Sequence, residues 1–115
     1  MNEMLTFKKL IDAWMEAANS NSHEVLKPFI SENFVWVSNN KMTMQGLMDW
    51  CDTTEAFDAE YESTIFDSED IIIGTHFIRP GNPEHLKGRK SRVMGVAKVK
   101  DGKVYEYFHN IMPLE

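Results

Sequence analysis

The sequence predicts an α+β protein, with helices in its first half and a mainly antiparallel sheet in its second half. Three observations indicate this class. Apolar residues repeat at helical spacing up to about residue 54, they alternate after it, and an Asp-Gly pair separates the last two alternating segments. The chain has 115 residues, of which 43% are hydrophobic, so it is long enough to bury one core. We therefore expect a single domain spanning residues 1–115.

The first half is expected to contain three helices and one strand. Residues 6–19 carry an apolar stripe at helical spacing, and a threonine stands at the N-cap position. A second, short helix is predicted over residues 22–30, where Pro28 kinks or shortens it. Residues 34–38 alternate like a strand, and residues 43–54 read as a third helix.

The second half is expected to contain four strands, over residues 60–66, 70–78, 91–100 and 103–112. A Pro-Gly-Asn-Pro sequence opens a predicted loop over residues 80–88. Asp101-Gly102 is the strongest turn signal in the chain, and we expect a two-residue hairpin with a positive φ at Gly102.

Composition excludes several classes of function. The net charge of −6 disfavours binding to nucleic acid, because phosphate neutralisation needs a basic surface. No apolar run approaches the length of a membrane span, and the first residues do not resemble a signal peptide. The single cysteine, Cys51, rules out an intrachain disulfide and favours a reducing, cytoplasmic setting. The four histidines show no metal-binding spacing, so no metal site is expected.

Charge is unevenly distributed along the chain. Nine acidic residues and no basic residue lie between Lys41 and Arg79, whereas eight basic residues and two acidic ones lie from Arg79 to Lys103. One interpretation is that neighbouring strands carry complementary charges on a solvated face. The other is a basic edge that recruits an anionic ligand or partner.

The order of elements and the final hairpin, DGKVYEYFHN over residues 101–110, resemble the SnoaL-like branch of the nuclear transport factor 2-like superfamily. Members commonly end with D-G-K-(I/V)-x-E-x-(W/F)-(D/H). FISENFVWVS, residues 29–38, is similar to the family's passage from second helix to first strand, and Gly46 opens the third helix as it often does there. The resemblance covers essentially the whole chain. It implies a cone-shaped α+β barrel, with three N-terminal helices packed on a curved sheet that surrounds a pocket.

The same resemblance implies a partner and a range of activities. The convex face of the sheet commonly packs against a second subunit, which predicts a homodimer. The superfamily includes isomerases, dehydratases, cyclases, epoxide hydrolases and proteins without chemistry, so the fold does not settle the function.

Ketosteroid isomerases of this superfamily provide a test of one mechanism. They need a carboxylate base at the end of the first strand, a tyrosine on the first helix and a protonated acid on a later strand. The matching positions hold Ser38, Trp14 and Gly95. Serine does not titrate in the range needed for proton abstraction and indole only donates, so this chain is not expected to be such an isomerase.

Alignment with the family pattern predicts which side chains face the pocket, namely Phe34, Trp36 and Ser38 on the first strand, Gly74, His76 and Ile78 on the central strand, and Tyr105, Tyr107, His109 and Ile111 on the last strand. His109 is the main catalytic candidate, because histidine titrates near neutrality and can act as acid or base. It occupies the position where SnoaL-like cyclases often carry an aspartate base. His76 is the second candidate, and the two can form a pair. Each can instead be a hydrogen-bonded core histidine.

Four further residues are candidates for ligand binding. Trp14 and Trp36 would line a pocket for a flat apolar ligand, while Ser38 and Tyr107 would hydrogen-bond a ligand oxygen. Each also has a structural interpretation, as core packing or as the end of a strand.

The sequence thus predicts a protein that binds a small apolar, oxygenated molecule without a cofactor. It is a possible isomerase, cyclase, dehydratase or hydrolase. The alternatives are a ligand-binding protein without catalysis and a dimeric protein-interaction module.

Overall fold

The computed structural model describes residues 4–54, 58–79 and 88–114. The predicted loop over residues 80–88 lies outside the described residues except for Gly88. In chain order the elements are α1 (Phe7–Ser20), the 3-10 turns η1 (His23–Val25) and η2 (Lys27–Phe29), β1 (Ile30–Trp36), β2 (Met42–Thr43), α2 (Met44–Thr53), β3 (Asp58–Asp67), β4 (Ile71–Arg79), β5 (Ser91–Lys100) and β6 (Lys103–Pro113).

The first half follows the predicted order, with differences at its second helix and first strand. Helix α1 is confirmed, and the hydroxyl of Thr6 accepts a hydrogen bond from the backbone N–H of Lys9 at 3.1 Å. The predicted helix over residues 22–30 is instead η1 and η2, because Pro28 lacks a donor and its ring clashes with the preceding turn of a continuous helix. Strand β1 begins and ends earlier than the expected residues 34–38.

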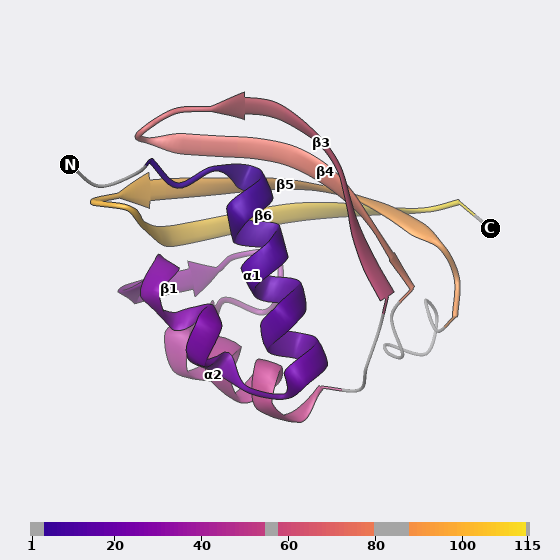
Figure 1. Cartoon of the computed structure of the whole chain (residues 1–115), viewed down its shortest axis with the longest axis horizontal. Helices are drawn as coiled ribbons and strands as arrows, with labels where there is room; N and C mark the ends of the chain where they lie inside the picture. Colours follow the sequence, from indigo (N-terminus) through magenta and orange to yellow (C-terminus); the bar gives the residue numbers. More distant parts are fainter. Residues whose placement is uncertain (1–3, 55–57, 80–87, 115) are drawn as a thin grey trace.

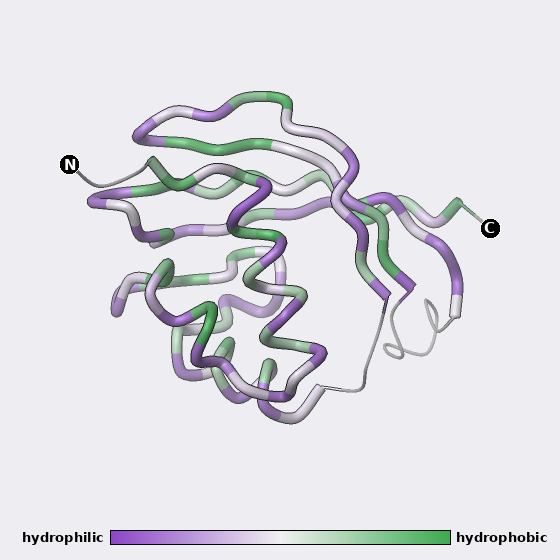
Figure 2. Tube along the Cα trace, in the orientation of Figure 1, coloured by the Kyte–Doolittle hydropathy of each residue, from purple (hydrophilic) through white to green (hydrophobic). Residues whose placement is uncertain are grey.

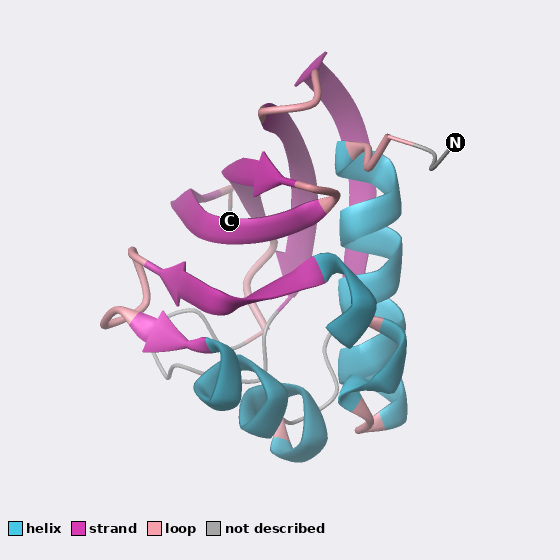
Figure 3. Cartoon of the chain, turned by 90° about the vertical axis from the view of Figure 1, so that its left-hand side faces the viewer, coloured by secondary structure: helices cyan, strands magenta, loops and turns pink. Residues whose placement is uncertain are grey.

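The strands form one six-stranded sheet in the order β2-β1-β6-β5-β4-β3. The pairing of β1 with β6 is parallel and every other pairing is antiparallel. The sheet curls without closing, and the helices lie against its concave face (Figure 1). Figure 3 shows the same arrangement from the side, with the helices together on one side of the curved strands. The α+β class with a mainly antiparallel sheet is therefore confirmed.

The turn between β5 and β6 is a two-residue hairpin. Asp101 has a φ of 54° and Gly102 a φ of 76°, as a type I′ turn requires at both central positions. Just beyond the turn, Lys98 pairs with Glu106 but Val99 pairs with Val104, which leaves Tyr105 without a partner on β5. This β-bulge explains why the expected position of Tyr105 in the pocket is wrong: the residue is 37% exposed.

The core lies between the helices and the concave face of the sheet. Phe7, Leu10, Leu26 and Phe34 are at most 1% exposed. The isoleucines at the start of β4 form a hydrophobic stretch that Figure 2 shows in green. Helix α1 is anchored at its first residue, where the backbone N–H of Phe7 donates to the carboxylate of Asp67 at 2.9 Å. A negative charge is favourable at this end of a helix.

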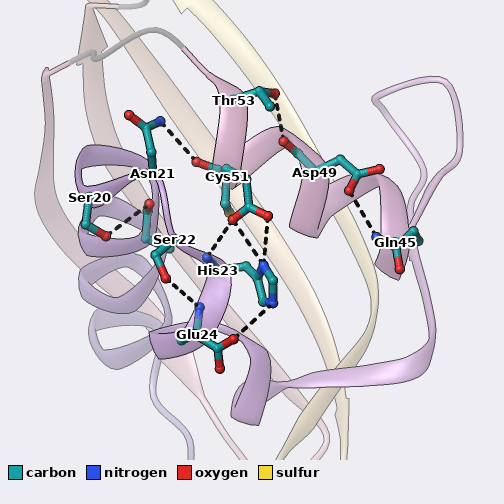
Figure 4. Close-up of polar contacts among 11 residues, drawn as sticks. Ser20, Asn21, Ser22, His23, Glu24, Gln45, Asp49, Cys51 and Thr53 are labelled. Atoms are coloured by element: carbon teal, nitrogen blue, oxygen red, sulfur yellow. Dashed lines mark hydrogen bonds and ion pairs between the residues drawn. The ribbon is translucent and has the colours of Figure 1, made fainter.

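Polar contacts hold the end of α1 against α2 (Figure 4). Asn21 adopts a left-handed φ of 52° at the C-cap of α1, and its side-chain amide donates to the carbonyls of Cys51 at 3.3 Å and Thr54 at 3.0 Å. The backbone N–H of His23 donates to Asp52 at 2.9 Å, and Nδ1 of His23 lies 3.0 Å from the same carboxylate. The two helices are therefore fixed to each other beside the concave face.

Complementary charges pair within the sheet, between the neighbouring strands β5 and β6 and between β5 and β3, which flank β4. Arg92 on β5 forms a two-pronged ion pair with Glu62 on β3, with both N–O distances at 3.0 Å. Lys98 on β5 contacts Glu106 on β6 at 3.2 Å. These pairs support the interpretation of the uneven charge as cross-strand pairing on a solvated face.

Candidate functional site

Five ring side chains gather on the concave face, and we refer to them as the aromatic group: Trp14 of α1, Trp36 of β1, Trp50 of α2, and Tyr107 and His109 of β6. Trp36 is at the centre. Its ring lies 5.0 Å from Trp14, 6.0 Å from Trp50, 5.8 Å from Tyr107 and 5.3 Å from His109, measured between centroids. All four contacts are edge-to-face, which is a favourable aromatic arrangement.

The parallel pairing of β1 and β6 brings Trp36 beside His109. In this register Trp36 pairs with Tyr107, and the backbone N–H of Val37 donates to the carbonyl of Tyr107 at 2.9 Å. The backbone N–H of His109 donates to the hydroxyl of Ser38 at 2.7 Å. The indole Nε1 of Trp36 and Nδ1 of His109 are then 2.7 Å apart, which is a short side-chain hydrogen bond.

His109 is half-buried, and burial lowers the pKa of its imidazole below the ordinary value because a charged ring is poorly solvated there. The neutral ring is therefore the main form at neutral pH. A neutral imidazole has one donor and one acceptor nitrogen, so His109 can still exchange hydrogen bonds with a ligand.

His76 of β4 lies on the helix-facing side of the sheet, with its ring centroid 6.4 Å from that of Phe7. Its Nδ1 is buried and has no hydrogen-bond partner among the described residues. Burial lowers the pKa of His76 to about 4, an effect that the nearby Phe77 backbone opposes and the charge of a protonated His109 reinforces. An unpaired buried nitrogen is costly in a protein, so it calls for an explanation.

Two glycines opposite each other in β4 and β5, Gly74 and Gly95, leave room for rings on the concave face. A Cβ at Gly95 would collide with the hydroxyl of Tyr107, so this hydroxyl lies directly over β5. Tyr107 is 2% exposed, and burial raises the pKa of its hydroxyl well above the ordinary value. The hydroxyl therefore stays protonated and able to donate.

The structure brings together most of the residues that the sequence analysis selected. Trp14, Trp36, Tyr107 and His109 belong to the aromatic group. Ser38 is exposed, and its hydroxyl accepts from the backbone N–H of His109. Their roles in binding or catalysis stay predictions.

Sequence reasoning missed Trp50 as a member of this group. The available signal was its position on the third predicted helix, on the same side as Leu47 and Cys51, which are buried. Cys51 is not a candidate nucleophile, because burial raises the pKa of its thiol to about 12 and keeps it protonated.

An open hollow of about 330 Å³ lies away from the aromatic group, at one end of β3 and β4. Its lining mixes charged and apolar side chains: Asp58, Ala59, Glu60, Phe77, Ile78, Arg79 and Lys90. Only Ile78 of these was expected to face the pocket.

The described residues contain no group of three or more histidine, cysteine, aspartate or glutamate side chains placed to hold a metal ion. Over the same part of the chain, no helix combines the length and apolar character that crossing a bilayer needs.

Comparison with known proteins found matches among solved structures only: no family model matches the sequence, and no curated protein does. An NTF2-like protein of unknown function from Cytophaga hutchinsonii superposes with a TM-score of 0.71 at 14% identity, covering 96% of this chain and 94% of that one. A SnoaL-like polyketide cyclase from Agrobacterium tumefaciens gives a TM-score of 0.69 at 13% identity, with 94% and 92% covered. An NTF2-like protein of unknown function from Shewanella baltica gives 0.58 at 13% identity, with 92% and 90% covered.

These similarities define the fold. The chain has the nuclear transport factor 2-like fold, and the SnoaL-like polyketide cyclase shares it. At such low identity the comparison shows the fold alone, so activity has to be argued from the site.

Proposed function

We propose that the protein binds a small, largely apolar molecule carrying a carbonyl or hydroxyl group at the aromatic group, and that His109 and His76 act on it. The reaction would be an isomerisation, cyclisation, dehydration or hydrolysis. The observation that carries this proposal is the placement of two half-buried histidines on the concave face, one of which has an unpaired buried nitrogen.

The physical argument combines two features of the face. Aromatic rings offer a flat apolar surface, and a few polar atoms among them orient an oxygenated ligand. Histidines kept neutral by burial can accept a proton or hydrogen bond at one ring nitrogen and donate a hydrogen bond from the other. The solved structure of a SnoaL-like polyketide cyclase with the same fold supports this class of substrate.

Binding is tested with tryptophan fluorescence, because all three tryptophans of the chain belong to the aromatic group. We expect 1-tetralone, a bicyclic ketone, to change the emission saturably and to raise the melting temperature. At about 100 times its dissociation constant a ligand adds roughly 2.7 kcal/mol, which is a rise of several degrees. Unchanged emission and melting temperature across a series of apolar ketones and phenols would refute the proposal.

Turnover is tested by deuterium exchange. A protein that removes a proton next to a carbonyl should exchange the α-hydrogens of 1-tetralone in D₂O, which proton NMR measures directly. We expect His76→Gln and His109→Gln to slow this exchange. The matched control is His23→Gln, because His23 bonds Asp52 at the junction with α2 and belongs to a different part of the fold. Saturable binding without exchange of any ketone would favour the ligand-binding alternative over catalysis.

The convex face of the sheet supports a second part of the proposal, a homodimer. Ile73, Val96 and Phe108 pair across β4, β5 and β6 and form an apolar row on this face, and Met94 beside them is 47% exposed. The ion pairs Lys98–Glu106 and Arg92–Glu62 lie within one chain, so the charges around the row are already neutralised. An apolar row with paired charges around it matches the same convex face of a second copy of the chain better than it matches a charged partner.

Light scattering tests the dimer. We expect a mass of twice 13.3 kDa for the wild type and a monomer for Phe108→Glu. Tyr105→Glu is the control, because this residue is exposed in the bulge and is not part of the apolar row. A wild-type mass near 13.3 kDa at micromolar concentration would contradict the dimer without touching the proposed ligand site.

A further inference from the structure

The hydrogen bond between Trp36 and His109 determines which ring nitrogen of His109 carries the proton. An indole nitrogen donates and does not accept. At 2.7 Å from Nε1 of Trp36, Nδ1 of His109 has to be the acceptor and therefore lacks a hydrogen. The neutral ring then carries its hydrogen on Nε2.

The indole N–H of Trp36, which is the donor, is held in place by the residues around it. Rings of Trp14, Trp50 and Tyr107 contact Trp36 edge-to-face, and the residue is 8% exposed. The backbone around it is fixed as well, because Val37 and Ser38 both hydrogen-bond to β6. Rotating the indole away from His109 would disrupt this packing, so the donor remains available whatever binds.

We propose that Trp36 is a positioning residue that holds His109 as the Nε2–H tautomer, so that His109 presents a hydrogen-bond donor to a neutral oxygen acceptor such as a ketone or ester carbonyl. The class of ligand rests on the proposed function, whereas the tautomer is a property of the free protein.

The consequence is a division of roles between the two histidines. A proton on Nδ1 of His109 would face the N–H of Trp36, and the two N–H groups would repel each other. This repulsion lowers the pKa of His109, as burial also does. His109 is therefore suited to donate to a ligand oxygen. Among the described residues no donor faces Nδ1 of His76, so this nitrogen is free to accept, although burial makes the ring a weak base.

In a proton transfer next to a carbonyl, the roles would be as follows. The C–H bond of the ligand breaks, and its proton goes to His76. The electron pair of that bond forms the carbon–carbon double bond of an enolate, whose oxygen accepts from Nε2–H of His109.

The tautomer is measured on the unliganded protein by ¹⁵N NMR of the histidine rings, because protonated and unprotonated ring nitrogens resonate far apart. For wild-type His109 we expect an unprotonated Nδ1 and a protonated Nε2 at pH 7.5. The opposite pattern would overturn the inference without any variant being needed.

The variant Trp36→Phe keeps an aromatic ring but removes the donor. The titratable rings near His109 are Tyr107 on its own strand and His76 across β5, and both remain in the variant. We expect the pKa of His109 to rise by roughly half a pH unit to one pH unit, as for the loss of one hydrogen bond to the neutral form. Trp14→Phe is the matched control, since Trp14 contacts Trp36 but does not bond His109. An unchanged pKa in folded Trp36→Phe, or an equal change in both variants, would overturn the positioning role.

The ligand class is tested with 1-tetralone and tetralin, which differ by the carbonyl oxygen. We expect wild-type protein to bind the ketone roughly two- to tenfold more tightly, and His109→Phe to lose this preference. Equal affinity of wild-type protein for the two would overturn the donor role of His109. If neither binds, the proposed function fails for this ligand class, while the NMR result still decides the tautomer.

Discussion

Gly74 in the middle of β4 is the position where one added methyl group should cost most. A Cβ there would lie 2.6 Å from Cε2 of Phe7 and 2.6 Å from the backbone oxygen of Ser63. Ordinary contacts of this kind are about 3.5–4.0 Å, so the atoms must separate by roughly 1 Å. Phe7 is fully buried and its backbone is bonded to Asp67, so the start of α1 would have to move.

We expect Gly74→Ala to lower the free energy of unfolding by about 1–3 kcal/mol, the usual cost of overpacking a core. The alanine's smaller loss of backbone entropy would offset part of this, by roughly 0.5–1 kcal/mol. Urea unfolding followed by tryptophan fluorescence gives the free energy. The melting temperature should fall by about 4 °C for each kcal/mol.

A double-mutant cycle with Phe7→Leu separates this collision from a general intolerance of strand residues. The smaller leucine should relieve the contact, so the double variant should be more stable than the sum of the single losses predicts, by at least about 0.5 kcal/mol. Wild-type stability of Gly74→Ala, or strict additivity in the cycle, would refute the contact as the cause.

Three further changes test other parts of the fold. Burial lowers the pKa of His76 to about 4, so the unfolded chain binds a proton more readily than the folded one. The folded state is therefore favoured fully above about pH 6.5 and loses this contribution to the free energy of unfolding as the pH falls toward 4. Between pH 7.5 and 5 the wild type should lose about 2 kcal/mol more than His76→Gln in urea unfolding. Asn21→Gly keeps the left-handed backbone but removes the side-chain bonds to α2, so it should cost about 1 kcal/mol in thermal unfolding, and an unchanged melting temperature would contradict the role of these bonds. Tyr105→Ala should change stability by less than about 0.5 kcal/mol, while Tyr107→Ala should cost about 3–5 kcal/mol; similar losses would contradict the bulge.

The sequence predicted those helices and strands whose own residues show a clear hydrophobic period. The stripe of α1 and the alternation of β5 depend on one buried face each, so their periods identify them. The start of β1 has no such signal, because residues 31–33 are polar, and the strand begins at Ile30 through the pairing of that residue with Val104 of β6. Strand β2 has two residues and exists through its pairing with β1.

The site was predicted in its residue types but not in its contacts. Trp36 and His109 are 73 positions apart, and only the parallel register of β1 and β6 places their rings together. Tyr105 was misplaced because alternation was carried through a bulge that inserts one residue before Tyr107. A single inserted residue exchanges the two faces of a strand, and nothing in the local sequence marked it.

The three positions that the sequence analysis matched to ketosteroid isomerases hold other residue types in this chain, and none of them is a carboxylate. Ser38 stands in place of the base and binds backbone, Trp14 replaces the tyrosine, and Gly95 leaves space that the Tyr107 hydroxyl fills. The polar groups that remain, Tyr107 and the two histidines, are all held in neutral forms by burial. Such a surface stabilises charge by donated hydrogen bonds and not by a fixed ion, so it suits a neutral carbonyl ligand better than a carboxylate. Of the three isomerase groups only the base is charged, and Ser38 at its matched position is neutral, which supports the proposal of a mechanism different from that of the isomerases.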